Sequence, residues 1–193
     1  DDDNDGVLDQ DDDYPLDPTR SSELEIAISG IVDPILRQCV ADIAQGSSVI
    51  SDVRDIGNGY TTTCPGGITT LSGLEPFTAL RTITLVAQGN SISDVTPLAG
   101  LNELLWVELE GNNISDISPL SVLPKIEHLG VNYNPVTTFP DGTYVSTLRS
   151  LHLSGALITD HSAITKLEII EVLNIENQAS FDASVMAGLD TLQ

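Results

Sequence analysis

Apolar residues return at regular intervals along the chain from about residue 80 onward. Segments begin at Leu104, Ile126, Leu148 and Ile170 at intervals of 22 residues, and a related segment begins at Leu80. They share the pattern LxxLxLxxNxIxDIxPLxxL, with departures in the later segments. Self-similarity at such a period is typical of small units that bury their apolar faces only by stacking on their neighbours. The pattern therefore predicts a solenoid built from repeats.

Each repeat contains a short stretch in which apolar and polar residues alternate, as in residues 107–109. Such alternation is typical of a strand with one buried face, and consecutive repeats would stack these strands in parallel. An asparagine follows the strand, where its side chain can bond backbone groups at a tight turn. Pro97 and Pro119 lie in the returning arm and disfavour a long helix, which favours short 3₁₀ turns. The asparagine column is Asn90, Asn112 and Asn134, and Ala156 and Gln178 take its place in the last two repeats.

A solenoid needs a cap on its apolar end, and residues 31–52 are predicted to supply a helical one. Asp33 suits the N-cap position and Pro34 the first helical position. We expect residues 18–30 to be a linker and residues 53–193 to be the repeat array, of about six units with the last one cut off. The apolar positions that recur at helical spacing in the cap are Ile35, Leu36, Cys39, Val40 and Ile43.

The composition of the chain argues against several classes of function. Aromatic residues make up only 4% of the chain, so the core must be aliphatic. The net charge of -22 leaves no basic face for phosphates, which argues against a nucleic-acid partner. No run of eighteen apolar residues occurs, so no membrane span is expected. The motifs GxSxG, HExxH, GxGxxG and the P-loop do not occur, so we expect no enzymatic activity and keep a hydrolase only as the least favoured alternative.

The repeat pattern resembles the leucine-rich repeat family, and within it the 22-residue bacterial class seen in internalins. The resemblance covers roughly Ile31 to the end of the chain, and several copies in register make it specific. It implies an α/β solenoid, a horseshoe with short parallel strands on its concave face, 3₁₀ or irregular segments on its convex side, and a helical N-terminal cap. It also implies protein binding or adhesion without naming a partner.

The chain has two cysteines, Cys39 in the predicted cap helix and Cys64 in the first repeat. The two elements should touch, which favours a disulfide that joins cap and array. Two buried free thiols are the alternative. A disulfide would favour a location outside the cytoplasm.

The first seventeen residues are rich in aspartate, and their spacing is DxDxDGxxDxxD. Calcium loops place carboxylates at positions 1, 3, 5 and 12, a glycine at 6 and a backbone carbonyl at 7. Residues 1–17 resemble a thrombospondin type 3 repeat, which implies calcium as cofactor and carboxylates that serve a second ion. The alternative is a disordered, self-repelling acidic tail. The expected ligands are Asp1, Asp3, Asp5, Val7, Asp9 and Asp12, with Asp9, Asp11 and Asp13 for the second ion.

The outward positions of the predicted strands would form the concave face. The single tryptophan, Trp106, lies there beside His128, and tryptophan is enriched at the energetic centres of interfaces. Gly130 would leave a dent in this face. A protein or glycan contact is favoured; the alternatives are an ordinary solvated face and a metal site of histidine and glutamate. The candidate ligand-binding residues are Trp106, Glu108, Glu110, His128, Asn132, His152 and Asn174.

We therefore expect a non-catalytic binding or adhesion module of a secreted or surface-attached bacterial protein, stabilised by calcium at its N-terminus. The expected location is extracellular or at the cell surface, with the signal or anchor segment lying outside this chain. The alternative is a structural spacer that presents other domains and has no ligand of its own.

Overall fold

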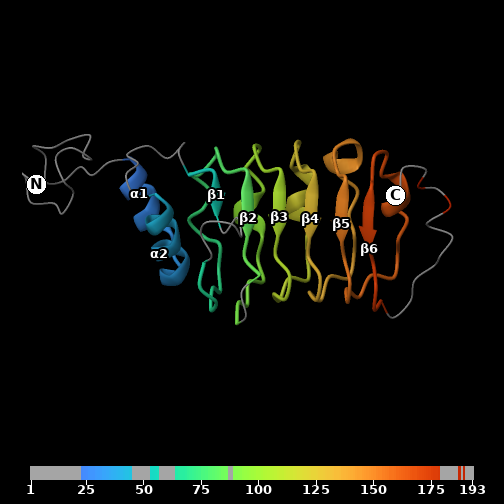
Figure 1. The fold of residues 1–193 in the computed structure, drawn as a ribbon, viewed down its shortest axis with the longest axis horizontal. Helices are drawn as coiled ribbons and strands as arrows, with labels where there is room; N and C mark the ends of the chain where they lie inside the picture. Colours follow the sequence, from blue (N-terminus) through green and yellow to red (C-terminus); the bar gives the residue numbers. More distant parts are fainter. Residues whose placement is uncertain are drawn as a thin grey trace, which may run out of the picture.

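The structure is a computed structural model that describes residues 23–44, 53–56, 64–86, 89–178, 187 and 189. Within these residues two helices stand at one end of an elongated array, and the strands follow side by side in chain order (Figure 1). The predicted calcium ligands in residues 1–17 lie outside the described part of the chain.

The described strands form one parallel sheet in which every strand pairs with the next one along the chain. Each strand is two or three residues long and comes from one repeat. The middle residues of β2 to β6 share one register position and point into the core, as the alternation predicted. The strands are β1 (Asp55–Ile56), β2 (Thr82–Thr84), β3 (Trp106–Glu108), β4 (His128–Gly130), β5 (Ser150–His152) and β6 (Val172–Asn174).

The returning arms form short 3₁₀ turns, which confirms the prediction for this side of the solenoid. Pro97 and Pro119 lie in the first turn of η2 and η3, where a residue without an N–H group is tolerated. The turns are η2 (Thr96–Leu98), η3 (Ser118–Val122), η4 (Thr143–Ser146) and η5 (Ile164–Lys166).

The asparagine column ties neighbouring repeats together. Asn112 is buried; its Oδ1 accepts from the backbone N–H of Ile92 at 3.1 Å, and its Nδ2 donates to the carbonyls of Leu85 and Leu109 at 3.1 and 2.9 Å. Asn134 repeats the arrangement one coil later, with Ile114 as its donor at 2.9 Å. Each side chain therefore satisfies buried backbone groups of two coils, which no helix or strand pairs.

Gln178 performs part of this role in the last described repeat. Its Nε2 donates to the carbonyl of Leu153 at 3.3 Å, and its Oε1 lies 2.9 Å from Nε2 of the buried His161. The longer amide thus reaches a backbone acceptor from the asparagine position.

The structure corrects one predicted boundary. Residues 18–30 were expected to form a linker, but α1 (Glu23–Gly30) is a helix whose Leu24 and Ala27 are buried in the core. These two residues are spaced three apart, so they share a helix face, and packing outweighs the weak signal of so short a segment. Gly73 (φ +97°) meets the backbone of Gly30 so closely that a Cβ there would clash.

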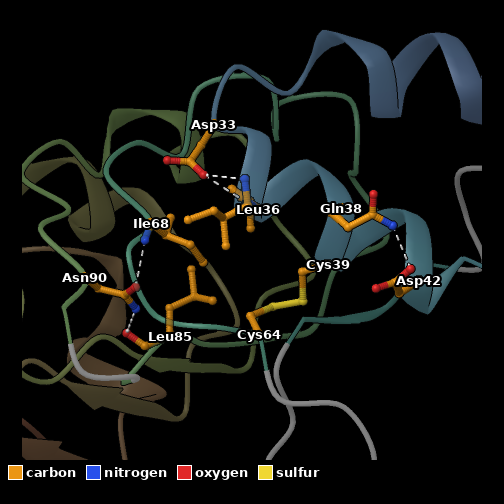
Figure 2. The surroundings of a disulfide bond; sticks show 10 residues. Asp33, Leu36, Gln38, Cys39, Asp42, Cys64, Ile68, Leu85 and Asn90 are labelled. Atoms are coloured by element: carbon orange, nitrogen blue, oxygen red, sulfur yellow. Dashed lines mark hydrogen bonds between the residues drawn. A yellow bond between two sulfur atoms is a disulfide. The ribbon is translucent and has the colours of Figure 1, made fainter.

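Helix α2 (Pro34–Ile43) is fastened to the first repeat at its N-cap and near its middle (Figure 2). One carboxylate oxygen of Asp33 accepts from the N–H groups of Ile35 and Leu36 at 2.9 and 3.0 Å, and the other accepts from the N–H of Thr69 at 2.8 Å. Further along the helix, a disulfide joins Cys39 to Cys64, with their Cα atoms 5.4 Å apart. The predicted N-cap and the predicted cysteine pairing are both present.

Candidate binding surface on the concave strands

The outward-facing positions of the sheet form a surface that we call the concave surface. Because side chains alternate along a strand, the first and third residues of β2 to β6 share this face opposite the buried middle residue. The residues at these positions, with those that continue the alternation after β2 to β6, are Thr82, Thr84, Val86, Trp106, Glu108, Glu110, His128, Gly130, Asn132, Ser150, His152, Ser154, Val172, Asn174 and Glu176.

Trp106 and His128 lie opposite one another on β3 and β4. Their rings are stacked, with centroids 3.6 Å apart and planes 8° apart. The tryptophan remains 46% exposed, whereas His128 is only 5% exposed. The expectation that His128 is exposed is therefore wrong, because the indole covers one side of the imidazole and Glu108 meets its edge.

Glu108 lies over Gly130 and joins the same cluster. Its Oε2 is 2.7 Å from Nε2 of His128, and a Cβ at position 130 would overlap its carboxylate. The dent expected at Gly130 is thus filled by Glu108, whose side chain is only 18% exposed. Within the described residues, Oε1 of Glu108 and Nδ1 of His128 are buried and have no hydrogen-bond partner. Unpartnered buried polar atoms of this kind call for an explanation.

Asn132 links Glu110 to the next repeat. Its Nδ2 donates to Oε2 of Glu110 at 3.1 Å, and its Oδ1 accepts from the N–H of Ser154 at 2.8 Å. These bonds bury Asn132, so the expectation that its side chain is exposed is also wrong. Asn174 accepts a hydrogen bond from the hydroxyl of Ser154 in the same way. Both predicted ligand-binding amides therefore join repeats.

His152 completes the histidine pair. Its ring centroid is 5.1 Å from that of His128, and its Nε2 is 2.9 Å from the hydroxyl oxygen of Ser150. Burial and the neighbouring His128 lower the pKa of His152, and the carboxylates of Glu108 and Glu110 oppose the shift only in part. His152 is consequently neutral at pH 7.

No lysine or arginine occupies a concave-surface position. Three lysine or arginine side chains form ion pairs with acidic residues of neighbouring repeats, and these acidic residues lie outside the concave surface. The pairs are Lys125 with Glu103, Arg149 with Glu171, and Lys166 with Asp141. The carboxylates of Glu108 and Glu110 thus have no lysine or arginine beside them on the concave surface, and the basic side chain next to Glu108 is that of His128.

Tyr133, in the turn beside the concave surface, is an exposed aromatic residue that the sequence reasoning missed. It follows Asn132, is 58% exposed and has a φ of 53°, a left-handed conformation that is rare for an aromatic residue. Its ring lies against Gly155, where a Cβ would be 2.8 Å from Cδ1 of the tyrosine. The available signal was the column of Gly89, Gly111 and Gly155, in which Tyr133 stands where a glycine is expected.

Neither a metal cluster nor a spanning helix occurs in the part of the chain that the structure describes. Its histidines, cysteines, aspartates and glutamates do not gather in threes that could hold a metal ion, so Glu108, His128 and His152 do not form the alternative metal site. None of its helices is long and apolar enough to cross a membrane.

Comparisons with known proteins support the fold. No family model and no curated protein sequence matches the chain. The solved structure of an internalin (InlF) from Listeria monocytogenes matches with a TM-score of 0.58 at 28% identity, covering 65% of this chain and 37% of that one. An internalin C2 (InlC2) from the same species matches with a TM-score of 0.52 at 22% identity, covering 86% of this chain and 93% of that one. The chain spans well under half of the length of the first of these, and it has the leucine-rich repeat solenoid fold.

Proposed function

We propose that this chain is a non-catalytic protein-binding module whose partner contacts the concave surface around Trp106. The observation that carries the proposal is the half-exposed indole stacked on a buried imidazole. Large aromatic side chains at the centre of a surface contribute most of the binding energy of many interfaces. An open sheet of short strands suits a macromolecular partner better than a small substrate, which is usually held in a concave pocket.

The rigidity of this surface adds support. His128 holds the indole from one side, and Glu108 holds His128 from the edge at 2.7 Å. A side chain that is fixed before binding loses less conformational entropy when the partner arrives. The short strands are themselves fixed, since every strand pairs with its neighbours in one register.

We also propose that the module works outside the cytoplasm and that residues 1–17 bind calcium. The disulfide between Cys39 and Cys64 supports the location, because such bonds persist mainly in oxidising compartments. The calcium proposal is supported by the spacing of Asp1, Asp3, Asp5 and Asp12 around Gly6. A secreted or surface-attached adhesion module combines these properties.

To test the binding surface, a displayed library of random peptides is selected for binding to the full chain in millimolar calcium. We expect Trp106→Ala to weaken the selected peptides about tenfold or more. Val172→Ala is the matched control, because Val172 lies in the same column as Trp106 and is similarly exposed. Selected peptides that bind Trp106→Ala as tightly as the wild type would refute the concave site and favour a structural spacer.

A further inference from the structure

The carboxylate of Glu108 carries the strongest indication of what this surface binds. It is largely buried, yet only one of its oxygens has a partner, Nε2 of His128 at 2.7 Å. Removing a carboxylate from water is costly unless its charge is paired and both oxygens are bonded. The carboxylate is therefore incompletely satisfied. Because Oε1 is buried, a donor of a partner reaches it only when the side chain of Glu108 turns outward, and a positively charged donor would favour that turn most.

The neighbouring groups leave this carboxylate incompletely satisfied. Glu110 adds a second carboxylate on the same face. This carboxylate accepts a hydrogen bond from the neutral side-chain amide of Asn132 at 3.1 Å. His152 is neutral at pH 7 because its pKa is lowered by burial and by His128. No lysine or arginine occurs at any concave-surface position, so the one group of this surface that can offset the charge of Glu108 is His128, and only in its protonated form. A cation supplied by a partner would complete the pairing of both carboxylates.

Trp106 defines the shape of the missing group. One side of its indole is covered by His128, and the side chain is still nearly half exposed next to Glu108. A guanidinium is planar, stacks on aromatic faces and donates several hydrogen bonds to carboxylates at the same time. An ammonium would gain the charge interaction but lose the planar stack and the paired bonds.

We propose, building on the proposed function, that the concave surface recognises a basic segment of its protein partner through an arginine side chain. The guanidinium lies on the exposed part of Trp106 and pairs with the carboxylates of Glu108 and Glu110. The net charge of -22 draws such a segment toward the module before contact and speeds its association.

A second exposed aromatic extends this surface. Tyr133 follows Asn132, the residue whose amide is bonded to Glu110. The N–H of Gly111 donates to the carbonyl of Asn132 at 2.9 Å, which places Tyr133 in the turn that follows β4, beyond the ends of β3 and β4. A partner segment that continues past Trp106 toward this turn would pack on Tyr133 with an apolar side chain.

The single tryptophan of the chain makes the site directly observable. The emission of Trp106 is titrated with tetra-arginine, tetra-lysine, tetra-glutamate and a chitin tetrasaccharide, at about 0.15 M salt with calcium in excess. We expect a saturable change with tetra-arginine, weaker binding of tetra-lysine, and no response to the other two. No saturable response to tetra-arginine overturns the proposal. So does a response to the tetrasaccharide alone, which would make this a glycan surface.

A pair of charge-matched variants separates this site from general attraction to an acidic protein. Glu108→Gln keeps the shape of the side chain over Gly130 and removes its charge, and we expect it to weaken tetra-arginine binding about tenfold. Glu168→Gln makes the same charge change at an exposed position off the concave surface and should alter binding by less than about twofold. Equal loss in both variants overturns the proposal. Circular dichroism melting of each variant verifies that it is folded.

The peptides selected from the random library distinguish failure of this inference from failure of the proposed function. Enrichment of arginine in peptides that require Trp106 supports both. Peptides that require Trp106 but lack basic residues would overturn the basic-partner inference and leave the protein-binding surface intact. If no selected peptide requires Trp106, the proposed function fails as well.

Discussion

The indole of Trp106 lies flat against the imidazole of His128, with centroids 3.6 Å apart and an interplanar angle of 8°. The two residues are 22 positions apart in the sequence and directly opposite one another in neighbouring strands. A half-exposed tryptophan is thereby held in one orientation by a buried histidine, which is itself bonded to Glu108.

Removal of the imidazole should free the indole. In His128→Ala we expect the steady-state anisotropy of Trp106 emission to fall and the emission maximum to move to longer wavelength, because the ring loses its contact surface and becomes more hydrated. His152→Ala is the control, since His152 contacts His128 but is not stacked on the indole. A change of equal size in the control would show that the stack does not hold the ring.

The asparagine column should be a major source of stability. Asn112→Ala removes the partner of the Ile92 N–H and one of the two side-chain donors to each of the carbonyls of Leu85 and Leu109, which keep Asn90 and Asn134. A buried N–H left unpaired costs about 1–3 kcal/mol, so we expect the free energy of unfolding to fall by about that amount in urea denaturation. The exposed neighbour Asn113, changed to alanine, should alter it by less than about 0.5 kcal/mol. Similar losses in the two variants would contradict the role of the column.

Asp33 should make the stability of the cap depend on pH. Burial alone would raise the pKa of Asp33, but hydrogen bonds from Thr69, Leu36 and Ile35 outweigh burial and hold the pKa below its ordinary value. A lowered pKa in the folded state means that the ionised carboxylate stabilises the fold above about pH 4, and that this contribution disappears as the pH falls through the folded pKa.

Comparison of the wild type with Asp33→Asn by urea denaturation measures this contribution. We expect the variant to be less stable by about 1–2 kcal/mol at pH 7, with the difference shrinking in acid. Asp42→Asn, on the exposed side of the same helix, is the matched control and should show little difference at either pH. A difference for Asp33→Asn that is constant with pH would contradict the assignment.

Tyr133 should lower the free energy of unfolding and strengthen the binding of the partner. Its φ of 53° costs about 1 kcal/mol that glycine would avoid, so Tyr133→Gly should raise the free energy of unfolding or leave it unchanged while weakening the selected peptides. Gly111→Ala makes the reverse change at the same repeat position (φ 70°), where a Cβ meets open space. It should lower stability by about 1 kcal/mol through the backbone alone. Tighter peptide binding by Tyr133→Gly would exclude the tyrosine from the contact surface.

Calcium binding is expected to depend on the spacing of the aspartates rather than on their number. In titration calorimetry Asp3→Asn, at a predicted ligand position, should weaken calcium binding about tenfold. Asp2→Asn makes the same charge change at a position without a predicted role and should have a much smaller effect. Equal effects of the two variants would favour an acidic tail with no defined loop.

The sequence alone determined the solenoid and its internal bonding. Apolar spacing located the strands, and the asparagines marked the turns. Asp33 and Pro34 marked the start of the cap helix, and Cys39 and Cys64 favoured the bridge that joins it to the array, whereas the bonds of Asp33 to Thr69 came from the structure alone. The features other than these bonds could be predicted because each depends on local spacing that recurs in every repeat or at one helix end. A short helix such as α1 lacks that repetition, and only its packing against α2 decides its conformation.

Only the tertiary structure decided the character of the concave surface. Alternation along a strand shows which side chains face outward, but not how a side chain in one coil lies over the next. Trp106 covers His128, and Glu108 fills the space above Gly130, because residues about 22 apart in the sequence become neighbours roughly 4.8 Å apart in the sheet. The same lateral contact buries a histidine that the pattern placed in solvent and leaves one carboxylate oxygen of Glu108 without a partner.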